Sequence, residues 1–291
     1  MSNDITPGKP LRVYRENGDY QDFSTDEIVG KKLNFYRNWM CGAGSKNIHI
    51  DMDGNIFGAS CKVGGRLGNV YEDFETPETW VNCNLDVCSC GADLFIPKMK
   101  NLSDEVLLRK TNDQDTTGKK VNDISETVEQ KAMERTFSSN IKQVYWEIGR
   151  RCNFDCSYCW PWIHNNHERH KSLEELISAT QLIEERFCRG SKANFIISGG
   201  EPTMNPAFMD WVRYIKAFGH DISMHSNASR QPDYYRELIH LCTVNFSAHF
   251  EFYNRDKFIK NIAAIVDEKV KTEETIGHLE VKLMMQPGDR P

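Results

Sequence analysis

From residue 144 onward the sequence alternates regularly between strand-like and helix-like segments, and this alternation constrains the fold more than any other feature. Short apolar runs predict strands at 144–148, 195–198, 222–226, 244–248 and 279–285. Helical spacing and capping residues between them predict helices that begin near Ser172, Asn205, Pro232 and Phe258. Such repeats form parallel sheets joined by helical crossovers, with ligands bound at the carboxyl ends of the strands. We therefore expect an α/β sheet or barrel whose functional residues directly follow the strands.

The chain also contains ten cysteines, and its composition makes disulfides a poor explanation for them. It carries 36 Lys and Arg against 42 Asp and Glu, and this net charge of −6 argues against a nucleic-acid-binding scaffold. Residues 1–30 are polar and interrupted by Pro7, Gly8 and Pro10, and all apolar runs are too short for a membrane span. We therefore expect a cytoplasmic, reducing setting, in which grouped cysteines serve metals or catalysis.

Three of the cysteines, Cys152, Cys156 and Cys159, follow the first predicted strand with the spacing C-x₃-C-x₂-C. Three thiolates on one loop are more than a nucleophile needs and one fewer than a closed structural zinc site uses. They are the right number to hold a cubane iron–sulfur cluster with one iron left open. A Cys₃His zinc site that uses His164 or His167, and unligated core thiols, are the alternatives.

With Tyr158 as the aromatic residue before the third cysteine, this loop resembles the C-x₃-C-x-aromatic-C motif of the radical S-adenosylmethionine (radical SAM) superfamily. The resemblance implies that SAM chelates the open iron through its amine and carboxylate, with Tyr158 at the SAM site. It further implies reductive cleavage of SAM to a 5′-deoxyadenosyl radical that abstracts hydrogen from a substrate, with an electron donor of flavodoxin or ferredoxin type.

A second motif, Ser198-Gly199-Gly200-Glu201, follows the second predicted strand. Glycines let the backbone approach a ligand closely, and a carboxylate accepts hydrogen bonds from an ammonium group. The resemblance assigns Gly199, Gly200 and Glu201 to the methionine amino group of SAM. At the ends of the next two strands, four polar residues resemble positions that contact the SAM ribose or carboxylate, although such residues also occur without that role. They are Ser226, Asn227, Ser247 and His249.

Five further cysteines lie in the first hundred residues, around a hairpin predicted from Ile48 to Phe57 with Asp53-Gly54 at its turn. They are Cys41, Cys61, Cys83, Cys88 and Cys90. This arrangement resembles SPASM/twitch domains, although it precedes the barrel and its Gly54-to-Cys61 spacing is two residues longer than usual. The resemblance implies one auxiliary [4Fe–4S] cluster that uses Cys41, Cys61 and two or three of the others. A zinc ribbon is the alternative, and Cys188 and Cys242 are expected to be packing residues.

The predicted organisation is a Cys-rich β-hairpin domain over 1–100, a polar linker over 101–140 and a radical SAM core over 141–291. The core is a partial (β/α) TIM-like barrel with five of the family's six strands, so either the chain is a fragment or another surface covers the open edge. We expect a radical SAM enzyme that acts on a peptide, protein or small metabolite, with an auxiliary cluster for electron transfer or substrate binding. A catalytically incomplete iron–sulfur or zinc-binding partner subunit is the alternative.

Overall fold

The computed structural model describes residues 11–14, 19–100, 141–159, 162, 164–272 and 280–284. The predicted linker over 101–140 lies outside the described residues, as do both ends of the strand predicted at 279–285. The chain divides into two compact units. The first comprises 1–47, 57–65 and 77–140, and the second comprises 48–56, 66–76 and 141–291. No described helix is both long enough and apolar enough to cross a membrane.

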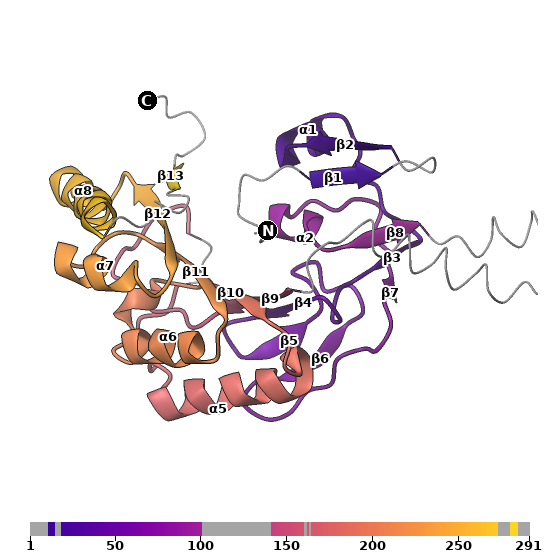
Figure 1. Cartoon of the computed structure of the whole chain (residues 1–291), viewed down its shortest axis with the longest axis horizontal. Helices are drawn as coiled ribbons and strands as arrows, with labels where there is room; N and C mark the ends of the chain where they lie inside the picture. Colours follow the sequence, from indigo (N-terminus) through magenta and orange to yellow (C-terminus); the bar gives the residue numbers. More distant parts are fainter. Residues whose placement is uncertain are drawn as a thin grey trace, which may run out of the picture. The chain divides into compact units, whose positions relative to one another are not determined.

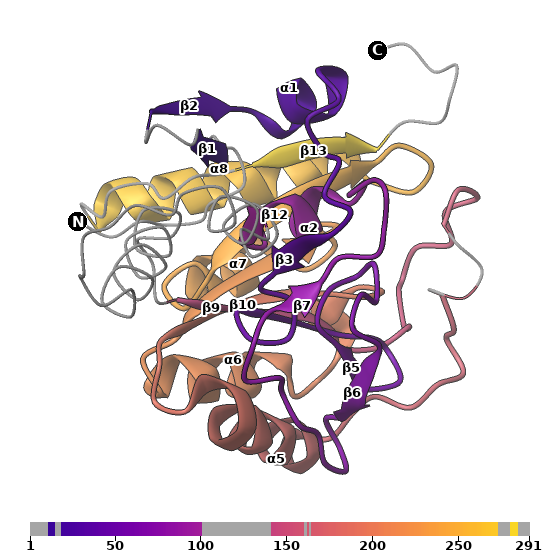
Figure 2. The same ribbon diagram turned by 90° about the vertical axis from the view of Figure 1, so that its right-hand side faces the viewer.

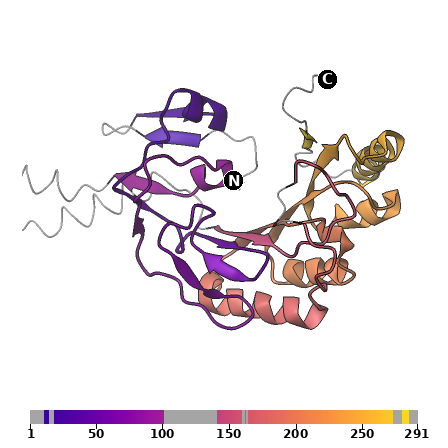
Figure 3. The ribbon, with the colours of Figure 1, turned by 180° about the vertical axis from the view of Figure 1, so that it is seen from behind.

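The second unit contains five parallel strands in chain order, as the strand–helix alternation predicted. They are β9 (Lys142–Glu147), β10 (Ala193–Ser198), β11 (Asp221–Ser226), β12 (Thr243–His249) and β13 (Val281–Met284). The helices between them are α5 (Leu173–Ile183), α6 (Phe208–Ala217), α7 (Pro232–Leu238) and α8 (Arg255–Lys271). Figures 1 and 3 show these helices along one face of the parallel strands. This mostly parallel α/β architecture confirms the predicted fold class and is consistent with a radical SAM β/α core.

A single apolar core joins this sheet to its helices. Trp146 on β9 and Trp211 on α6 are fully buried and meet edge to face, with ring centroids 5.0 Å apart. The indole nitrogen of Trp211 donates to Thr180 Oγ1 on α5 at 2.9 Å, so its polar atom is satisfied inside the core. Because the strands are packed in this way, the loops at their carboxyl ends are held on a rigid support.

The sheet continues beyond β9 with three strands from the N-terminal part of the chain. They are β4 (Asn47–Ile50), β5 (Asn55–Phe57) and β6 (Arg66–Asn69), and the complete order is β13-β12-β11-β10-β9-β4-β5-β6. Figure 2 shows β5 and β6 side by side at this end of the sheet. The predicted hairpin with its Asp53-Gly54 turn is therefore present, as the β4–β5 pair.

The position of this hairpin differs from the predicted domain organisation, in which residues 1–100 form one Cys-rich domain. Residues 48–56 and 66–76 belong to the same unit as 141–291. The physical reason is burial, because apolar side chains on β4, on β5 and just after β6 enter the core that contains Trp146. These side chains are Ile48, Ile50, Ile56, Val70 and Phe74.

The first unit holds the remaining N-terminal elements. Strands β1 (Leu11–Tyr14) and β2 (Tyr20–Phe23) form an antiparallel pair followed by α1 (Thr25–Gly30). Strands β7 (Val81–Asn82), β3 (Trp39–Cys41) and β8 (Lys98–Lys100) form a three-stranded antiparallel sheet, and α2 covers Gly91–Leu94. Two small apolar clusters stabilise this unit, and both contain cysteines predicted to bind the auxiliary cluster.

The predicted capping box at the start of α5 is confirmed, and it makes the stability of the protein depend on pH. Ser172 and Glu175 exchange hydrogen bonds at the first turn. Hydrogen bonds from Arg169, supported by those from Ser172, lower the pKa of Glu175 from its ordinary 4.5 to about 2. Since the pKa is lower in the folded state, this contribution is complete above the ordinary pKa and is lost as the pH falls toward 2.

We therefore expect wild type to exceed Glu175→Gln in free energy of unfolding at about pH 6, and this difference to shrink at about pH 3. Urea unfolding at the two pH values measures it. Glu174→Gln removes a carboxylate from the same turn without touching the capping box and is the control. A difference that does not change with pH would show that the carboxylate of Glu175 is not responsible.

Candidate functional site

The three cysteines of the C-x₃-C-x₂-C motif lie on the loop that follows β9, at the carboxyl edge of the parallel sheet. All three are partly exposed, and all ten cysteines of the chain are free thiols. Cys152 Sγ accepts a hydrogen bond from the backbone of Phe154 at 3.4 Å, and a turn joins Cys159 N to Cys156 O at 2.9 Å. Burial raises the pKa of Cys152 to about 11. The loop therefore presents three accessible sulfur ligands on a locally hydrogen-bonded backbone.

The end of β12 contacts this cysteine loop through His249. Its Nδ1 lies 2.9 Å from the hydroxyl of Tyr158 and 3.5 Å from the sulfur of Cys156, and its ring stacks on that of Tyr158. Beyond the strand, Glu251 accepts hydrogen bonds from both the backbone and the hydroxyl of Ser157. The structure thus brings His249 and Tyr158, two residues predicted to contact SAM, together at the cysteines.

The Gly-Gly-Glu segment lies against the start of the same loop. Gly200 N donates to Gly149 O at 2.8 Å, and Glu201 N donates to Arg151 O at 2.9 Å. A Cβ atom on Gly200 would lie 2.3 Å from Arg151 O, and Gly199 has a φ of +127°. We expected these glycines to allow close approach of a ligand, whereas in the structure the close approach is to the backbone that leads into Cys152.

The carboxylate of Glu201 is buried and ties the ends of β10 and β11 together. One oxygen accepts hydrogen bonds from the backbone and hydroxyl of Thr203 and from the hydroxyl of Ser226, and the other accepts from Asn227 N at 2.7 Å. Ser226 also shares a 2.9 Å hydrogen bond with the hydroxyl of Tyr235. Burial raises the pKa of Glu201, and these four hydrogen bonds oppose that shift. The predicted contact of Glu201 with a ligand ammonium group stays a prediction.

Asn227 and Ser247 occupy different places relative to the cysteine loop. The amide of Asn227 donates to Asn153 Oδ1 at 3.0 Å and lies 3.8 Å from the sulfur of Cys152. Asn227 is therefore brought to the site. Ser247 is half-buried on β12, in register with Lys282 of β13. A contact of either residue with SAM stays a prediction.

Sequence reasoning missed three polar residues that hold the cysteine loop. Asn153 accepts hydrogen bonds from Asn227 and from Ser229, while Asn166 accepts the backbone N–H of Cys152 at 3.0 Å. Glu251 is the third. Their only sequence signal is that polar side chains stand near the motif or just after a strand, and that signal is common in loops of every kind.

One histidine of the zinc alternative, His164, already has partners in this structure. Both ring nitrogens of His164 are engaged, one by Asp155 at 3.1 Å and the other by the amide of Asn166 at 2.9 Å. Sulfurs around a tetrahedral zinc ion lie about 3.8 Å apart. Among the described residues, neither the motif cysteines nor the N-terminal cysteines form a group of three ligand atoms within 4.8 Å of one another.

One group of the described residues does meet that distance, namely Glu184, Cys188 and His220. His220 Nδ1 accepts the backbone N–H of Ala193 at 3.2 Å, so the other ring nitrogen carries the hydrogen and donates it to Glu184. A nitrogen that holds a proton does not ligate a metal, and metal-bound histidines usually donate from the second nitrogen instead. Cys188 is fully buried, in agreement with its predicted packing role.

The N-terminal cysteines lie in the first unit, where four of them share one electrostatic environment. Cys41 pairs in register with Lys98, and the pKa values of Cys41 and Cys88 are raised by burial and lowered by the Lys98 charge. Both thiols also interact with the thiol of Cys83, and Cys88 interacts with that of Cys61.

Asp93 holds the segment that carries Cys61. Its buried carboxylate accepts the backbone N–H groups of Ser60 and Cys61 and the hydroxyl of Ser60, all within 3.0 Å. Cys90, by contrast, stands at the N-terminus of α2 as its cap residue. Cys88 is thus the thiol that interacts with each of Cys41, Cys61 and Cys83.

A parallel α/β core with a three-cysteine loop after one strand and a Gly-Gly-Glu turn after the next defines a cofactor-binding class of protein. Residues 146–279 match the family model of the Radical SAM superfamily. This match supports the radical SAM superfamily for the domain over 146–279, and with it an enzyme for which a [4Fe–4S] cluster and SAM are the implied cofactors. A comparison with curated proteins found no match.

The residues present fit these cofactors. Cys152, Cys156 and Cys159 are free thiols, and thiolates are the usual ligands of iron–sulfur clusters. They would hold three irons and leave the fourth for SAM. The surrounding polar groups come from the ends of β10, β11 and β12, the edge of an α/β sheet at which ligands bind.

Proposed function

We propose that the protein cleaves SAM reductively and uses the resulting radical to abstract hydrogen from a substrate. The observation that carries the proposal is the loop of three partly exposed thiols, set at the carboxyl edge of the family-matched sheet and hydrogen-bonded to the ends of the next three strands. When bound, the reduced cluster would supply the electron that breaks a C–S bond of SAM, and this cleavage yields methionine and a 5′-deoxyadenosyl radical.

The chain's own residues act in this proposal by positioning and by excluding water. Asn227, His249 and the backbone beside Gly200 hold the cysteine loop from three sides, which fixes where a cofactor would stand. Glu201 is buried and its carboxylate accepts hydrogen bonds from Thr203, Ser226 and Asn227, so in this proposal it fixes the ends of β10 and β11 beside the cofactor. Packing and hydrogen bonds around the cysteine loop would thus keep water and other hydrogen donors away from the radical.

The test is release of 5′-deoxyadenosine from SAM by the full chain, reconstituted with iron and sulfide without oxygen and reduced chemically. Protein taken through the same steps without iron is the control. Release that requires iron, SAM and reductant would support the proposal. If iron-loaded protein releases none, the alternative of a catalytically incomplete subunit takes its place.

We further propose an auxiliary [4Fe–4S] cluster held by Cys41, Cys61, Cys83 and Cys88, with Cys90 outside the ligand set. The support is that Cys88 interacts electrostatically with Cys41, Cys61 and Cys83, and that the positive charge of Lys98 favours the thiolates of Cys41 and Cys88. A cluster with four thiolate ligands has no open iron, which favours electron transfer over substrate binding.

This ligand set predicts different results for two neighbouring cysteines. Cys88→Ala should lose about half of the bound iron and sulfide, because one of two clusters is lost, whereas Cys90→Ala should keep both clusters. Iron and sulfide analysis of reconstituted full-length protein measures this. Equal loss in both variants would place Cys90 in the ligand set, and no loss in either would contradict an auxiliary cluster.

The remaining parts of the proposal concern partners. The electron would come from a flavodoxin or ferredoxin type of donor in the cytoplasm, and the substrate would be a peptide, a protein or a small metabolite. The net charge of −6 favours a substrate that is not polyanionic. Candidate substrates can be screened by the rise they cause in 5′-deoxyadenosine release.

A further inference from the structure

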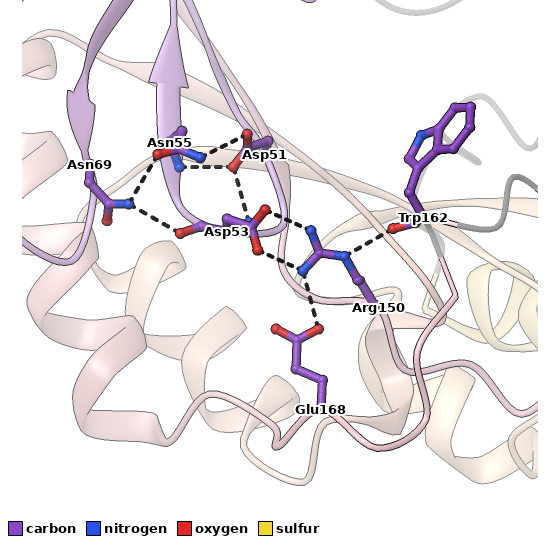
Figure 4. Close-up of polar contacts among 7 residues, drawn as sticks. All are labelled: Asp51, Asp53, Asn55, Asn69, Arg150, Trp162 and Glu168. Atoms are coloured by element: carbon purple, nitrogen blue, oxygen red, sulfur yellow. Dashed lines mark hydrogen bonds and ion pairs between the residues drawn. The ribbon is translucent and has the colours of Figure 1, made fainter.

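An ion pair joins the turn of the β4–β5 hairpin to the start of the cysteine loop, across 97 positions in the sequence (Figure 4). The guanidinium of Arg150 donates to both carboxylate oxygens of Asp53, at 2.7 Å each. Paired hydrogen bonds of this kind are stronger and more directional than a single contact. The bonds from Arg150 lower the pKa of Asp53, so this carboxylate is ionised at neutral pH.

The turn that carries Asp53 is itself held firmly. Asp51 accepts the backbone N–H groups of Asp53 and Asn55, at 3.0 and 2.9 Å, and the amide of Asn69 on β6 donates to Asp53 O at 3.1 Å. Gly54 has a φ of +84°, and a Cβ atom there would lie 2.5 Å from the ring of Tyr71. The carboxylate of Asp53 therefore projects from a backbone with little freedom to move.

Arg150 in turn closes the base of the loop that contains the cysteines. Its Nε donates to Trp162 O at 2.9 Å, a second nitrogen contacts Glu168 at 3.5 Å, and its own carbonyl accepts the N–H of Asn165 at 3.1 Å. The two arms of the loop, before and after the cysteines, thus meet at this one side chain. Two residues later lies Cys152.

We infer that Asp53 and Arg150 are positioning residues for the catalytic cluster. The sheet extension formed by β4, β5 and β6 is rigid and carries Asp53. Arg150 binds Asp53 and also contacts both arms of the loop. The three thiols are therefore held in place in the protein without iron. This inference rests on the proposed function only in that the group bound by the three thiols is taken to be the catalytic cluster. The anchoring itself is a property of the protein without iron.

The experiment compares wild type with Asp53→Asn and Arg150→Lys as full-length proteins. Asp53→Asn removes the charge of the carboxylate, and Arg150→Lys keeps the positive charge but removes the paired donors and the bond to Trp162. Glu237→Gln is the matched control, because it removes a carboxylate paired with an arginine, Arg213, elsewhere in the same unit. Melting temperatures of the four proteins identify any general loss of folding.

The first measurement is amide hydrogen exchange without iron, followed at Cys152 and Asn165, whose N–H groups bond to Asn166 and to Arg150 O. We expect both amides to exchange roughly three- to tenfold faster in Asp53→Asn and Arg150→Lys, with no change in Glu237→Gln. Unchanged exchange in both loop variants would overturn the inference. Faster exchange over the whole unit would also overturn it, since that result means general destabilisation.

The second measurement is the change that SAM causes in the electron paramagnetic resonance signal of the reduced, iron-loaded protein. We expect wild type and Glu237→Gln to show it fully and the two loop variants to show it in a smaller fraction of molecules. A wild-type protein without this change would count against the proposed function, while the exchange result would still decide the anchoring. Variants that match wild type here would overturn the role in positioning the cluster.

Discussion

Replacing Cys156 with alanine is expected to reduce 5′-deoxyadenosine release from SAM to the level of iron-free protein. Loss of a residue that only supports a metal ligand typically costs up to about 100-fold in affinity or activity, and loss of a ligand itself should cost more. Two thiolates cannot hold three irons of the proposed cluster. The variant should fold normally, because the side chain of Cys156 is partly exposed and contributes little to the core.

The control for this prediction is Cys242→Ala. Cys242 is buried in the core of the same unit and belongs to neither cysteine group. Its replacement should lower the melting temperature slightly and leave SAM cleavage unchanged. Substantial cleavage by Cys156→Ala, with iron content like that of wild type, would show that this thiol is not a ligand of the catalytic cluster.

Gly200→Ala is expected to abolish SAM cleavage as completely as Cys156→Ala does, although it removes no cysteine ligand of the cluster. The added Cβ would lie 2.3 Å from Arg151 O and 2.7 Å from Arg151 C. Both are backbone atoms, so no side chain can rotate away, and the backbone just before Cys152 must move. Overpacking of this kind costs about 1–3 kcal/mol of stability, and the displacement falls on the loop that carries the cysteines.

Gly30→Ala is the matched control, because a Cβ at Gly30 meets nothing within 4 Å and Gly30 is exposed at the end of α1. This variant should match wild type in melting temperature, iron content and SAM cleavage. Gly200→Ala should bind less iron at the catalytic site and unfold at a lower temperature. Full activity in Gly200→Ala would mean that the contact between this turn and the cysteine loop does not matter for cofactor binding.

Several features of the protein follow from the sequence alone, because they depend on residues close together in the chain. The five parallel strands, the helices between them and the Ser172–Glu175 capping box are local patterns of apolar spacing and hydrogen bonding. The C-x₃-C-x₂-C loop is likewise contained within eight residues, and the family comparison confirms the superfamily that it indicated.

The helix start predicted at Asn205 shows the limit of such local patterns. Asn205 does cap a turn, since its side chain accepts the N–H of Ala207, but α6 begins only at Phe208. A short 3₁₀ turn over Pro202–Met204 comes first. In this turn Thr203 donates to the carboxylate of Glu201, which also binds the end of β11. Helical periodicity in the sequence does not indicate this role.

Only the tertiary structure decided how distant segments meet. The hairpin of β4 and β5 stands within a Cys-rich stretch of sequence, yet it joins the core sheet because its isoleucines complete an apolar core made mostly by residues from Val144 onward. Glu201 with Asn227, Asn227 with Asn153, and Asp53 with Arg150 are pairs of polar residues separated by 26, 74 and 97 positions. Local spacing carries no record of such partners, because their proximity results from sheet order and core packing. The chemistry of the cysteine loop could therefore be predicted from the sequence, whereas the contacts that hold the loop in place could be identified only from the tertiary structure.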